Sequence, residues 1–523
     1  MSKKLPIVFF VGVFLLVAVI SAKSYFSIDP DFGWRITAGQ LYLRSGIPQT
    51  DPFTYTMPSF HWVDHAWIST LLMGFLYPNI GMLGLSVLFS FLCVTAILAA
   101  AFRFDRKNII EAKVIKRLKG ISKVKVLRFL DIPFILSIVI IFPFTGIRAQ
   151  VFTWIFLALF LKFLFDRGLW EKYRHLTPFY FLLWSNIHGG YISGLTCLFL
   201  YLLAKTLKER KINYKEAFIF VASTTVTLIN PYGFGNWREV WSSVSDTSLR
   251  FSIAEWVPSI FRMDFAFVYY LTFSLVLVVR YFRKFTLGQM FIYFFFLIQA
   301  VTSLRNVVLW VIVSLALSSQ SIIFFYEEVV KDKISTDRFV KVYKGAWFLA
   351  IFIFLFEMSF GMYSSLSLQE HIFYPQGAVK YLNNQDINGN VFSEYGWGGY
   401  LIWKYPQKKV FVDGRMPSWR EVTIMESEET SAFETYKDVL TGDIDYRVVF
   451  AKYDINTLLW PKRKTEKGLY DILQEKLDNL LALFGKEKNN FNLIDTIDKD
   501  GWQLIYEDNN AVIYKNLSNI EGN

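Results

Sequence analysis

Two carboxylates, Asp29 and Asp31, follow closely on the first long apolar segment of the chain. If that segment is a helix that leaves a membrane, both side chains arrive at the water interface, where ionisable groups usually have a function. We therefore expect Asp29 and Asp31 to line a pocket at this interface. The Asp-Pro sequence leaves a second role open, because either side chain could cap a short helix in the loop.

The same loop holds further side chains that could ligate a divalent metal, because imidazole and carboxylate groups suit ions such as Mn or Zn. No dedicated metal-binding spacing is present, so a bound Mn or Mg ion stays an open alternative and no cofactor is certain. The candidate ligands are Asp29, Asp31, His61, Asp64, His65 and, from a later loop, Glu255.

Three basic side chains lie in short breaks between later apolar segments, at Arg148, His188 and Arg305. A guanidinium group presents a fork of donors that matches phosphate oxygens. His188 precedes two glycines, and a helix broken there would expose backbone N–H groups that can bind an anion. These side chains are candidate phosphate ligands, although an arginine can instead reach lipid headgroups and a histidine can be structural.

Tryptophans accompany these positions, with Trp34, Trp62 and Trp67 in or beside the first loop and Trp237 in the longest internal loop. Flat aromatic rings stack on sugar rings. Trp and Tyr also collect at membrane interfaces without any ligand, so both roles remain open.

The composition of the 523-residue chain indicates a membrane protein. Hydrophobic residues make up 54% of it and aromatic residues 19%, and the mean hydropathy is +0.33. The net charge of +11 does not indicate nucleic-acid binding, because Lys and Arg occur in short runs between apolar segments, the pattern that sets membrane orientation. Cys93 and Cys197 both lie in apolar segments, which supports neither a disulfide framework nor a cysteine metal site.

The apolar segments predict a polytopic α-helical membrane protein with about 11 transmembrane helices. The run after Lys3 and Lys4 is interpreted as an uncleaved first helix, because it is longer than most signal-peptide cores. Several later segments are shorter than the ~20 residues that a perpendicular helix needs, so broken or tilted helices are expected. The later segments are residues 80–102, 132–144, 151–165, 176–187, 191–204, 217–229, 267–281, 290–301, 307–326 and 346–363, and an amphipathic segment at residues 67–77 precedes them.

Loop charge predicts the orientation of these helices. Basic runs recur on one side, at residues 103–128, 167–174, 205–215, 280–284 and 331–344, and such runs favour the cytoplasm. The N-terminus is then cytoplasmic, while the candidate residues and everything after residue 363 lie on the opposite face. We expect the plasma (inner) membrane of a bacterium or archaeon as the location.

From residue 364 the composition becomes that of a soluble α/β domain. The sequence therefore predicts a membrane domain at residues 1–363, with an extracytoplasmic first loop at residues 23–67, and an extracytoplasmic domain at residues 364–523. In that domain we expect strands at residues 390–393, 409–412 and 446–451, helices at residues 400–403 and 469–484, and a hairpin at residues 502–515 that turns at Asn509 and Asn510.

Residues 29–35, Asp-Pro-Asp-Phe-Gly-Trp-Arg, resemble the first extracytoplasmic loop of GT-C membrane glycosyltransferases. Within that class the segment is similar to the catalytic subunit of oligosaccharyltransferase, with its Asp-Pro-aromatic-Phe run and downstream arginine, and more distantly to protein mannosyltransferases. Residues 395–400 and 410–415 look like a degenerate form of the Trp-Trp-Asp-Tyr-Gly segment of that subunit and the strand after it. The central Asp of that segment is absent here.

The resemblance implies an inverting transfer of a sugar from a polyprenyl phosphate or diphosphate to a glycan, lipid or protein acceptor. Such a transfer needs a base at the acceptor and positive charge at the departing phosphate. On this hypothesis Asp29 is the base, Asp31 is the second candidate, and Arg148, His188 and Arg305 bind the phosphate. The residues expected to contact the acceptor or the sugar are Trp34, Arg35, Asp64, His65, Glu255 and Trp397.

Two other functions would use the same residues. In a transporter or flippase for lipid-linked saccharides, the arginines would bind phosphate during passage, but the sequence contains no convincing internal repeat or mid-membrane acidic residue. In a non-catalytic envelope assembly protein, the soluble domain would bind a partner, and Gly398-Gly399 and Asp413-Gly414-Arg415 would be turns.

Overall fold

The computed structural model describes residues 4–101, 132–245, 255–259, 264–331, 336–420, 427–462 and 491–516. The chain forms two compact units, one of Met1–Ile28 with Val63–Ser367 and the other of Asp29–Trp62 with Leu368–Asn523. This division differs from the predicted domains at the first loop. Residues 29–62, which the sequence placed in the membrane domain, pack with the C-terminal segment.

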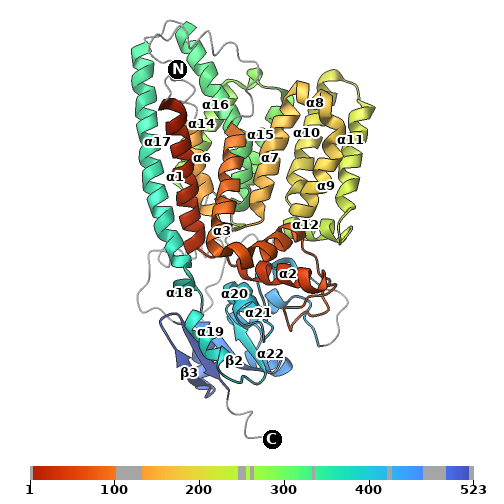
Figure 1. Ribbon diagram of the computed structural model, residues 1–523, viewed down its shortest axis with the longest axis vertical. Helices are drawn as coiled ribbons and strands as arrows, with labels where there is room; N and C mark the ends of the chain where they lie inside the picture. The colour runs from red at the N-terminus through yellow and green to blue at the C-terminus, as the bar shows by residue number, and fades with distance from the viewer. Residues whose placement is uncertain are drawn as a thin grey trace. The chain divides into compact units, whose positions relative to one another are not determined.

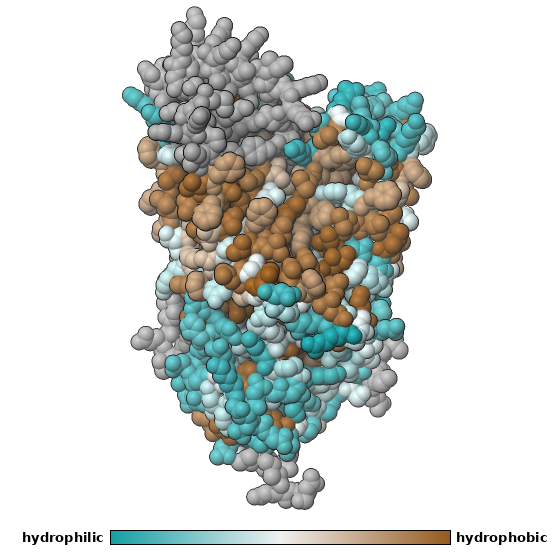
Figure 2. All heavy atoms as spheres, in the orientation of Figure 1, coloured by the Kyte–Doolittle hydropathy of each residue, from teal (hydrophilic) through white to brown (hydrophobic). Residues whose placement is uncertain are grey.

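The first unit is helical (Figure 1). Hydrophobic residues gather over its helices on the face that Figure 2 shows. Large apolar side chains on its surface, such as Phe179, Phe218 and Phe352, are 68%, 71% and 66% exposed, as expected of helices that face lipid. Its described helices are α1 (Lys4–Phe26), α3 (Trp67–Ala101), α6 (Ile132–Ile141), α7 (Gln150–Phe165), α8 (Arg167–Tyr173), α9 (Thr177–Ile187), α10 (Tyr191–Glu209), α11 (Tyr214–Thr225), α12 (Gly235–Ser245), α14 (Phe265–Arg280), α15 (Leu287–Thr302), α16 (Val307–Lys331) and α17 (Thr336–Ser365).

Length and hydropathy identify the helices that can cross a membrane. Among the described residues, Trp67–Ala101, Leu304–Phe325 and Lys344–Leu368 are long and apolar enough. Shorter apolar helices lie at Phe10–Phe26, Ile132–Phe144, Gln150–Phe165, Phe265–Arg280 and Leu287–Thr302. The helices therefore lie where apolar segments were predicted, and the total of about 11 spans stays a prediction.

Helix α3 contains a kink at the boundary between two predicted segments. Pro78 lies inside it, and Gly81 has φ 62° and ψ −168°, which is not helical. Proline removes a backbone hydrogen bond, and glycine adopts a positive φ without steric cost. The kink lies near the boundary between the amphipathic segment predicted at residues 67–77 and the apolar segment predicted at residues 80–102.

The second unit contains a four-stranded sheet with the order β1-β2-β4-β3. Strand β1 (Asn390–Ser393) pairs in parallel with β2 (Ile455–Pro461), and β4 (Ala511–Lys515) pairs antiparallel with both β2 and β3 (Gln503–Glu507). A buried cluster that includes Phe392 and Leu458 from the sheet forms its core. The helices of this unit are α2 (Phe32–Ser45), α18 (Glu370–Phe373), α19 (Gln376–Asn383), α20 (Gly398–Lys404), α21 (Ala432–Thr441), α22 (Tyr446–Lys452) and α24 (Leu493–Lys499).

Three of the elements predicted for this unit are confirmed: strand β1, helix α20, and the hairpin of β3 and β4. The strand predicted at residues 446–451 is wrong, because Tyr446–Lys452 is helix α22. Tyr446, Val449 and Phe450 are buried at helical spacing, whereas Val448 is 65% exposed. The aromatic and β-branched residues that suggested a strand are therefore placed in a helix by tertiary packing.

The segment predicted as a strand at residues 409–412 belongs to no strand of the sheet. It forms one parallel bridge with the first loop, between Val410 and Thr54. Val410 donates its N–H to the backbone oxygen of Phe53 at 3.0 Å, and Tyr55 donates to Val410 at 3.2 Å. The helix predicted at residues 469–484 lies outside the described residues.

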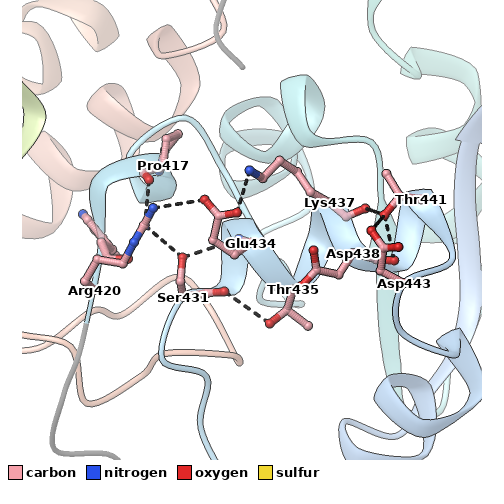
Figure 3. Close-up of polar contacts among 10 residues, drawn as sticks. Pro417, Arg420, Ser431, Glu434, Thr435, Lys437, Asp438, Thr441 and Asp443 are labelled. Carbon is pink, nitrogen blue, oxygen red and sulfur yellow. Dashed lines mark hydrogen bonds and ion pairs between the residues drawn. The ribbon is translucent and has the colours of Figure 1, made fainter. Parts of the chain in front are cut away.

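Helix α21 begins at a set of polar contacts that Figure 3 shows. The Oγ atom of Ser431 accepts a hydrogen bond from the backbone N–H of Glu434 and thus caps the helix. Nη1 of Arg420 donates to the Ser431 hydroxyl at 3.0 Å, and Nη2 donates to Oε1 of Glu434 at 3.0 Å. Lys437 pairs with the other Glu434 oxygen at 2.6 Å, one turn further along the helix.

Arg415 connects the first loop to the C-terminal segment within the second unit. Its guanidinium group donates to Oδ1 of Asp413 at 2.8 Å and, through Nη1, to Oδ1 of Asp51 at 2.7 Å. The three side chains are 6%, 0% and 0% exposed. Burial alone would lower the pKa of Arg415, but Asp413 and Asp51 raise it, so the net shift is upward. Four rings surround the guanidinium group, with centres at 5.1 to 5.6 Å: Trp34, Phe53, Trp62 and Trp419.

Two glycines allow α2 and α20 to approach each other closely. A Cβ atom on Gly33 would lie 2.2 Å from the backbone oxygen of Gly399, and a Cβ atom on Gly399 would lie 2.2 Å from the backbone oxygen of Pro30. Both clashes would be with backbone atoms, which cannot move aside as the end of a flexible side chain can. This contact places the start of α2, and with it Asp29 and Asp31, against α20 of the second unit.

We expect Arg415→Met to lower the free energy of unfolding by about 3 kcal/mol or more, because it leaves two buried carboxylates without their cation. The matched control is Arg447→Met. The native Arg447 side chain is 57% exposed and pairs with Asp500 at 2.7 Å. The control variant should lower the stability clearly less than Arg415→Met does, since exposed ion pairs contribute little. Thermal unfolding of the purified chain measures both, and equal shifts in Tm would contradict the role of Arg415.

Candidate functional site

Two arginines that are far apart in the sequence meet at one short segment of the helical unit. Arg148 lies just before α7, and Arg305 lies in the 3-10 turn Leu304–Asn306 between α15 and α16. Nη1 of Arg148 donates to Oε1 of Glu255 at 2.7 Å. The backbone N–H of Arg305 donates to the backbone oxygen of Glu255 at 2.9 Å, and its guanidinium group lies 5.1 Å from the centre of the Trp256 ring. Arg148, Glu255, Trp256 and Arg305 are called the arginine cluster below.

The Glu255 carboxylate is charged at neutral pH. Arg148 makes the largest contribution to lowering its pKa, burial acts in the opposite direction, and Arg305 lowers the pKa further. The side chains of Arg148 and Glu255 are 25% and 38% exposed, so solvent weakens their attraction. Two guanidinium groups and one carboxylate leave the arginine cluster with a net charge of +1.

Two buried hydroxyl groups next to the arginine cluster have no hydrogen-bond partner among the described residues, Oγ of Ser259 and Oγ of Ser303. Ser259 is 2% exposed and Ser303 is 7% exposed. A backbone hydrogen bond of 2.9 Å from Leu304 to Val257 joins the two segments that carry them. Buried polar atoms are normally paired, so these two hydroxyls are exceptions among the described residues.

His188 ends α9 and is held by its Nδ1 atom. The backbone N–H of Gly190 donates to Nδ1 at 3.0 Å, and Oγ1 of Thr153 lies 2.8 Å from the same atom. Because Nδ1 accepts from a backbone N–H, the proton of the neutral ring is assigned to Nε2. Nε1 of Trp184 donates to Thr153 at 3.1 Å, which leaves the Thr153 hydroxyl to donate to His188. The neutral His188 ring therefore carries its proton on Nε2.

Asp64 and His65 lie at the start of α3 in the helical unit. Oδ1 of the buried Asp64 accepts a hydrogen bond from the backbone N–H of Ala66 at 2.9 Å, so it begins the helix. The His65 ring meets the His188 ring edge to face, with centres 5.5 Å apart. The structure thus brings one predicted acceptor residue, His65, beside one predicted phosphate ligand, His188.

The predicted base belongs to the second unit, where Asp29 and Asp31 form the turn before α2. Oδ1 of Asp29 accepts from the backbone N–H of Asp31 at 3.0 Å, and Oδ1 of Asp31 accepts from Nε1 of Trp34 at 3.0 Å. The Trp34 ring stacks on the Arg35 guanidinium group at 4.3 Å, and both side chains are buried. The local turn role is therefore present, and the catalytic role stays a prediction.

Trp397 is 2% exposed, and its Nε1 atom donates to the backbone oxygen of Phe373 at 2.8 Å. Packing and this hydrogen bond give Trp397 a structural role. Its predicted contact with an acceptor stays a prediction. A divalent metal also stays a prediction. Over the ranges that the structure describes, no three His, Cys, Asp or Glu side chains gather as a metal ion would require.

The sequence did not single out Thr153, Ser259 or Ser303. Thr153 had one weak signal, because it is a polar residue inside the apolar segment at residues 151–165. Its partners His188 and Trp184 are 35 and 31 residues away, so no local spacing indicates the contact. No sequence pattern marks Ser259 or Ser303. They are distinguished only by being buried without a partner among the described residues.

We expect Thr153→Val to destabilise the chain by about 1–3 kcal/mol, because it leaves the buried Trp184 donor and the His188 acceptor short of a partner. Thr153→Ser keeps the hydroxyl group and should lower the stability of the chain clearly less. Thermal unfolding of both variants in detergent tests this expectation. If both variants unfold at the same temperature, the hydroxyl of Thr153 does not hold His188.

Comparison with solved structures identifies the fold. The archaeal oligosaccharyltransferase AglB from Archaeoglobus fulgidus, in complex with an inhibitory peptide and a dolichol-phosphate, has a TM-score of 0.52 and 12% identity over 86% of this chain and 69% of that chain. ArnT from Cupriavidus metallidurans in the apo state has a TM-score of 0.51 and 11% identity over 99% of both chains. No family model and no curated protein sequence matches the chain. The fold is that of GT-C membrane glycosyltransferases.

Proposed function

We propose that this chain is an inverting membrane glycosyltransferase that moves a sugar from a polyprenyl phosphate or diphosphate to an acceptor on the extracytoplasmic face. The convergence of Arg148 and Arg305 on the segment at Glu255 carries this proposal. Two guanidinium groups at the ends of apolar helices suit the phosphate of a lipid whose tail lies in the membrane. The GT-C fold supports the same class of reaction.

The departing phosphate gains negative charge when its bond to the sugar breaks. Arg148 and Arg305 would stabilise that charge, and His188 would be a further phosphate-binding residue. Fixed donors of this kind need little rearrangement during the reaction, because helix ends and backbone hydrogen bonds already hold them.

Asp29 is proposed as the base that takes the proton from the acceptor hydroxyl, with Asp31 as the second candidate. Attack from the face opposite the departing phosphate would invert the anomeric carbon. Asp29 is half-buried, and its backbone oxygen accepts from Phe32 at 3.0 Å, which fixes the turn that carries it.

The proposed partners are a lipid-linked sugar donor, the membrane, and a glycan, lipid or protein acceptor. The solved AglB structure contains a dolichol-phosphate and an inhibitory peptide, which supports a lipid phosphate as the ligand class here. We place the chain in the plasma (inner) membrane with the N-terminus in the cytoplasm and the C-terminal domain outside, from the charge of its loops.

Asp29→Asn should lower the rate of transfer by about a hundredfold or more, because it removes the base. Mass spectrometry of lipid-linked sugars and envelope glycans would compare wild-type, deletion and Asp29→Asn cells. We expect the deletion and Asp29→Asn to accumulate the same prenyl-linked sugar and to lose the same glycan residue.

The matched control for this experiment is Asp386→Asn, which changes an exposed aspartate outside the proposed site and should behave as wild type. An effect of the deletion alone would remove Asp29 from catalysis. Unchanged lipids and glycans in the deletion would contradict sugar transfer itself.

A further inference from the structure

Four basic side chains follow one another closely in the sequence where α10 ends and α11 begins. Lys208 is in the last turn of α10, Arg210 and Lys211 follow that helix, and Lys215 is in the first turn of α11. All four side chains are exposed. Lys208, Arg210, Lys211 and Lys215 are called the basic surface below.

The basic surface is remote from the candidate site. Helix α10 begins at Tyr191, three residues after His188, and ends at Glu209. A helix of this length rises about 27 Å from end to end. The basic surface therefore lies far from the residues proposed to bind the sugar donor, and any ligand there is a different one.

The basic surface adjoins side chains that face lipid. Tyr214, Phe218 and Val221 of α11 are exposed and spaced three or four residues apart, so they form one stripe along the helix. The stripe ends at Tyr214, which lies between Lys211 and Lys215 in the sequence. Tyrosine is enriched at the level of lipid headgroups. The basic side chains therefore lie where the headgroups of a membrane would be.

The composition of this end of the helices favours anions. Residues 166–176 contain three Lys or Arg and two Asp or Glu, and residues 205–216 contain five and two. Figure 2 shows hydrophilic residues above a hydrophobic band at the upper right, where Figure 1 places the ends of α8, α10 and α11. A boundary between cations and apolar side chains suits a ligand with an anionic head and apolar tails.

A buried carboxylate holds together the elements behind the basic surface. Glu216 of α11 is 2% exposed and accepts hydrogen bonds from Nε1 of Trp170 at 3.0 Å, from Nη1 of Arg174 at 2.9 Å and from Nζ of Lys205 at 2.8 Å. These donors lie in α8, in the 3-10 turn that follows it, and in α10. The contacts fix the end of α10 against the start of α11, and with it the spacing of the basic side chains.

Arg210 has a backbone conformation that usually belongs to glycine. Its φ of 51° and ψ of 28° are left-handed. Glycine is the common residue at this position after a helix, because it has no Cβ atom to clash. An arginine there lowers the stability of the turn, and a function of its charge accounts for that cost.

We propose that the basic surface binds the headgroup of an anionic phospholipid in the membrane leaflet at this end of the helices. The cations attract the phosphate, and the stripe on α11 contacts the acyl chains. This surface takes no part in the proposed sugar transfer, so the inference stands apart from it.

The test measures the lipid preference of the purified full chain in nanodiscs with equal amounts of dioleoylphosphatidylglycerol and dioleoylphosphatidylcholine. The two lipids have the same acyl chains, and only the first carries a net negative charge. Native mass spectrometry of the chain released from the nanodiscs gives the ratio of the two lipids that stay bound. The wild type should retain phosphatidylglycerol in excess, and added salt should reduce this excess.

The variant that tests the basic surface is Lys208→Gln/Arg210→Gly/Lys211→Gln. It should lower the ratio by about fivefold or more, since each Lys or Arg near a membrane surface contributes about fivefold to the binding of anionic lipid. Arg210→Gly also relieves the left-handed backbone, so the variant should unfold in phosphatidylcholine nanodiscs at the wild-type temperature or above it.

Two further variants separate the basic surface from other effects. Lys208→Gln/Lys215→Gln leaves the turn between the helices unchanged and should lower the ratio by a smaller amount. The matched control Lys380→Gln/Lys409→Gln/Lys499→Gln removes three exposed charges from the second unit and should keep the wild-type ratio.

Three results would overturn the inference. The first is a wild-type chain that shows no preference for phosphatidylglycerol. The second is a wild-type ratio in both variants of the basic surface. The third is an equal fall of the ratio in the matched control, because total charge rather than the basic surface would then set the preference.

Discussion

The buried ion triad of Asp51, Arg415 and Asp413 is the constraint on which the second unit depends. Asp51 and Arg415 are 364 residues apart, and their side chains are almost completely shielded from water. Either carboxylate without the guanidinium group would be a buried charge without a partner, which costs several kcal/mol. The first loop must therefore pack against the C-terminal segment for these charges to be tolerated. The surrounding aromatic rings keep water away and add cation–π attraction.

This constraint explains why a loop between two apolar helices has a defined structure. The segment at residues 53–56 pairs with the segment around Val410, and the Thr56 hydroxyl donates to the backbone oxygen of Phe411 at 2.7 Å. The contact of Gly33 with Gly399 then orients α2. Asp29 and Asp31 thus belong to a turn that the packing of the second unit holds in place.

The candidate polar side chains of the helical unit lie where one helix ends and the next begins. Arg148 lies before α7, His188 follows α9, and Arg305 lies between α15 and α16. Charged side chains are costly inside apolar spans, so the ends of helices are the places where they are tolerated. The same placement suits a ligand with a charged head and an apolar tail, and it agrees with a fold shared with GT-C membrane glycosyltransferases.

The sequence alone determined the class of protein, the positions of the long apolar helices, helix α20, strand β1, the terminal hairpin and the types of candidate residue, because hydropathy, turn residues and loop charge are local properties. Tertiary structure alone decided that residues 446–452 form a helix, that the first loop packs with the C-terminal segment, and that Arg415 is buried between two carboxylates. It also decided that Glu255 pairs with Arg148, 107 residues away. The physical reason is that burial and charge pairing depend on contacts between segments that are distant in the sequence, and a local sequence pattern does not determine those contacts.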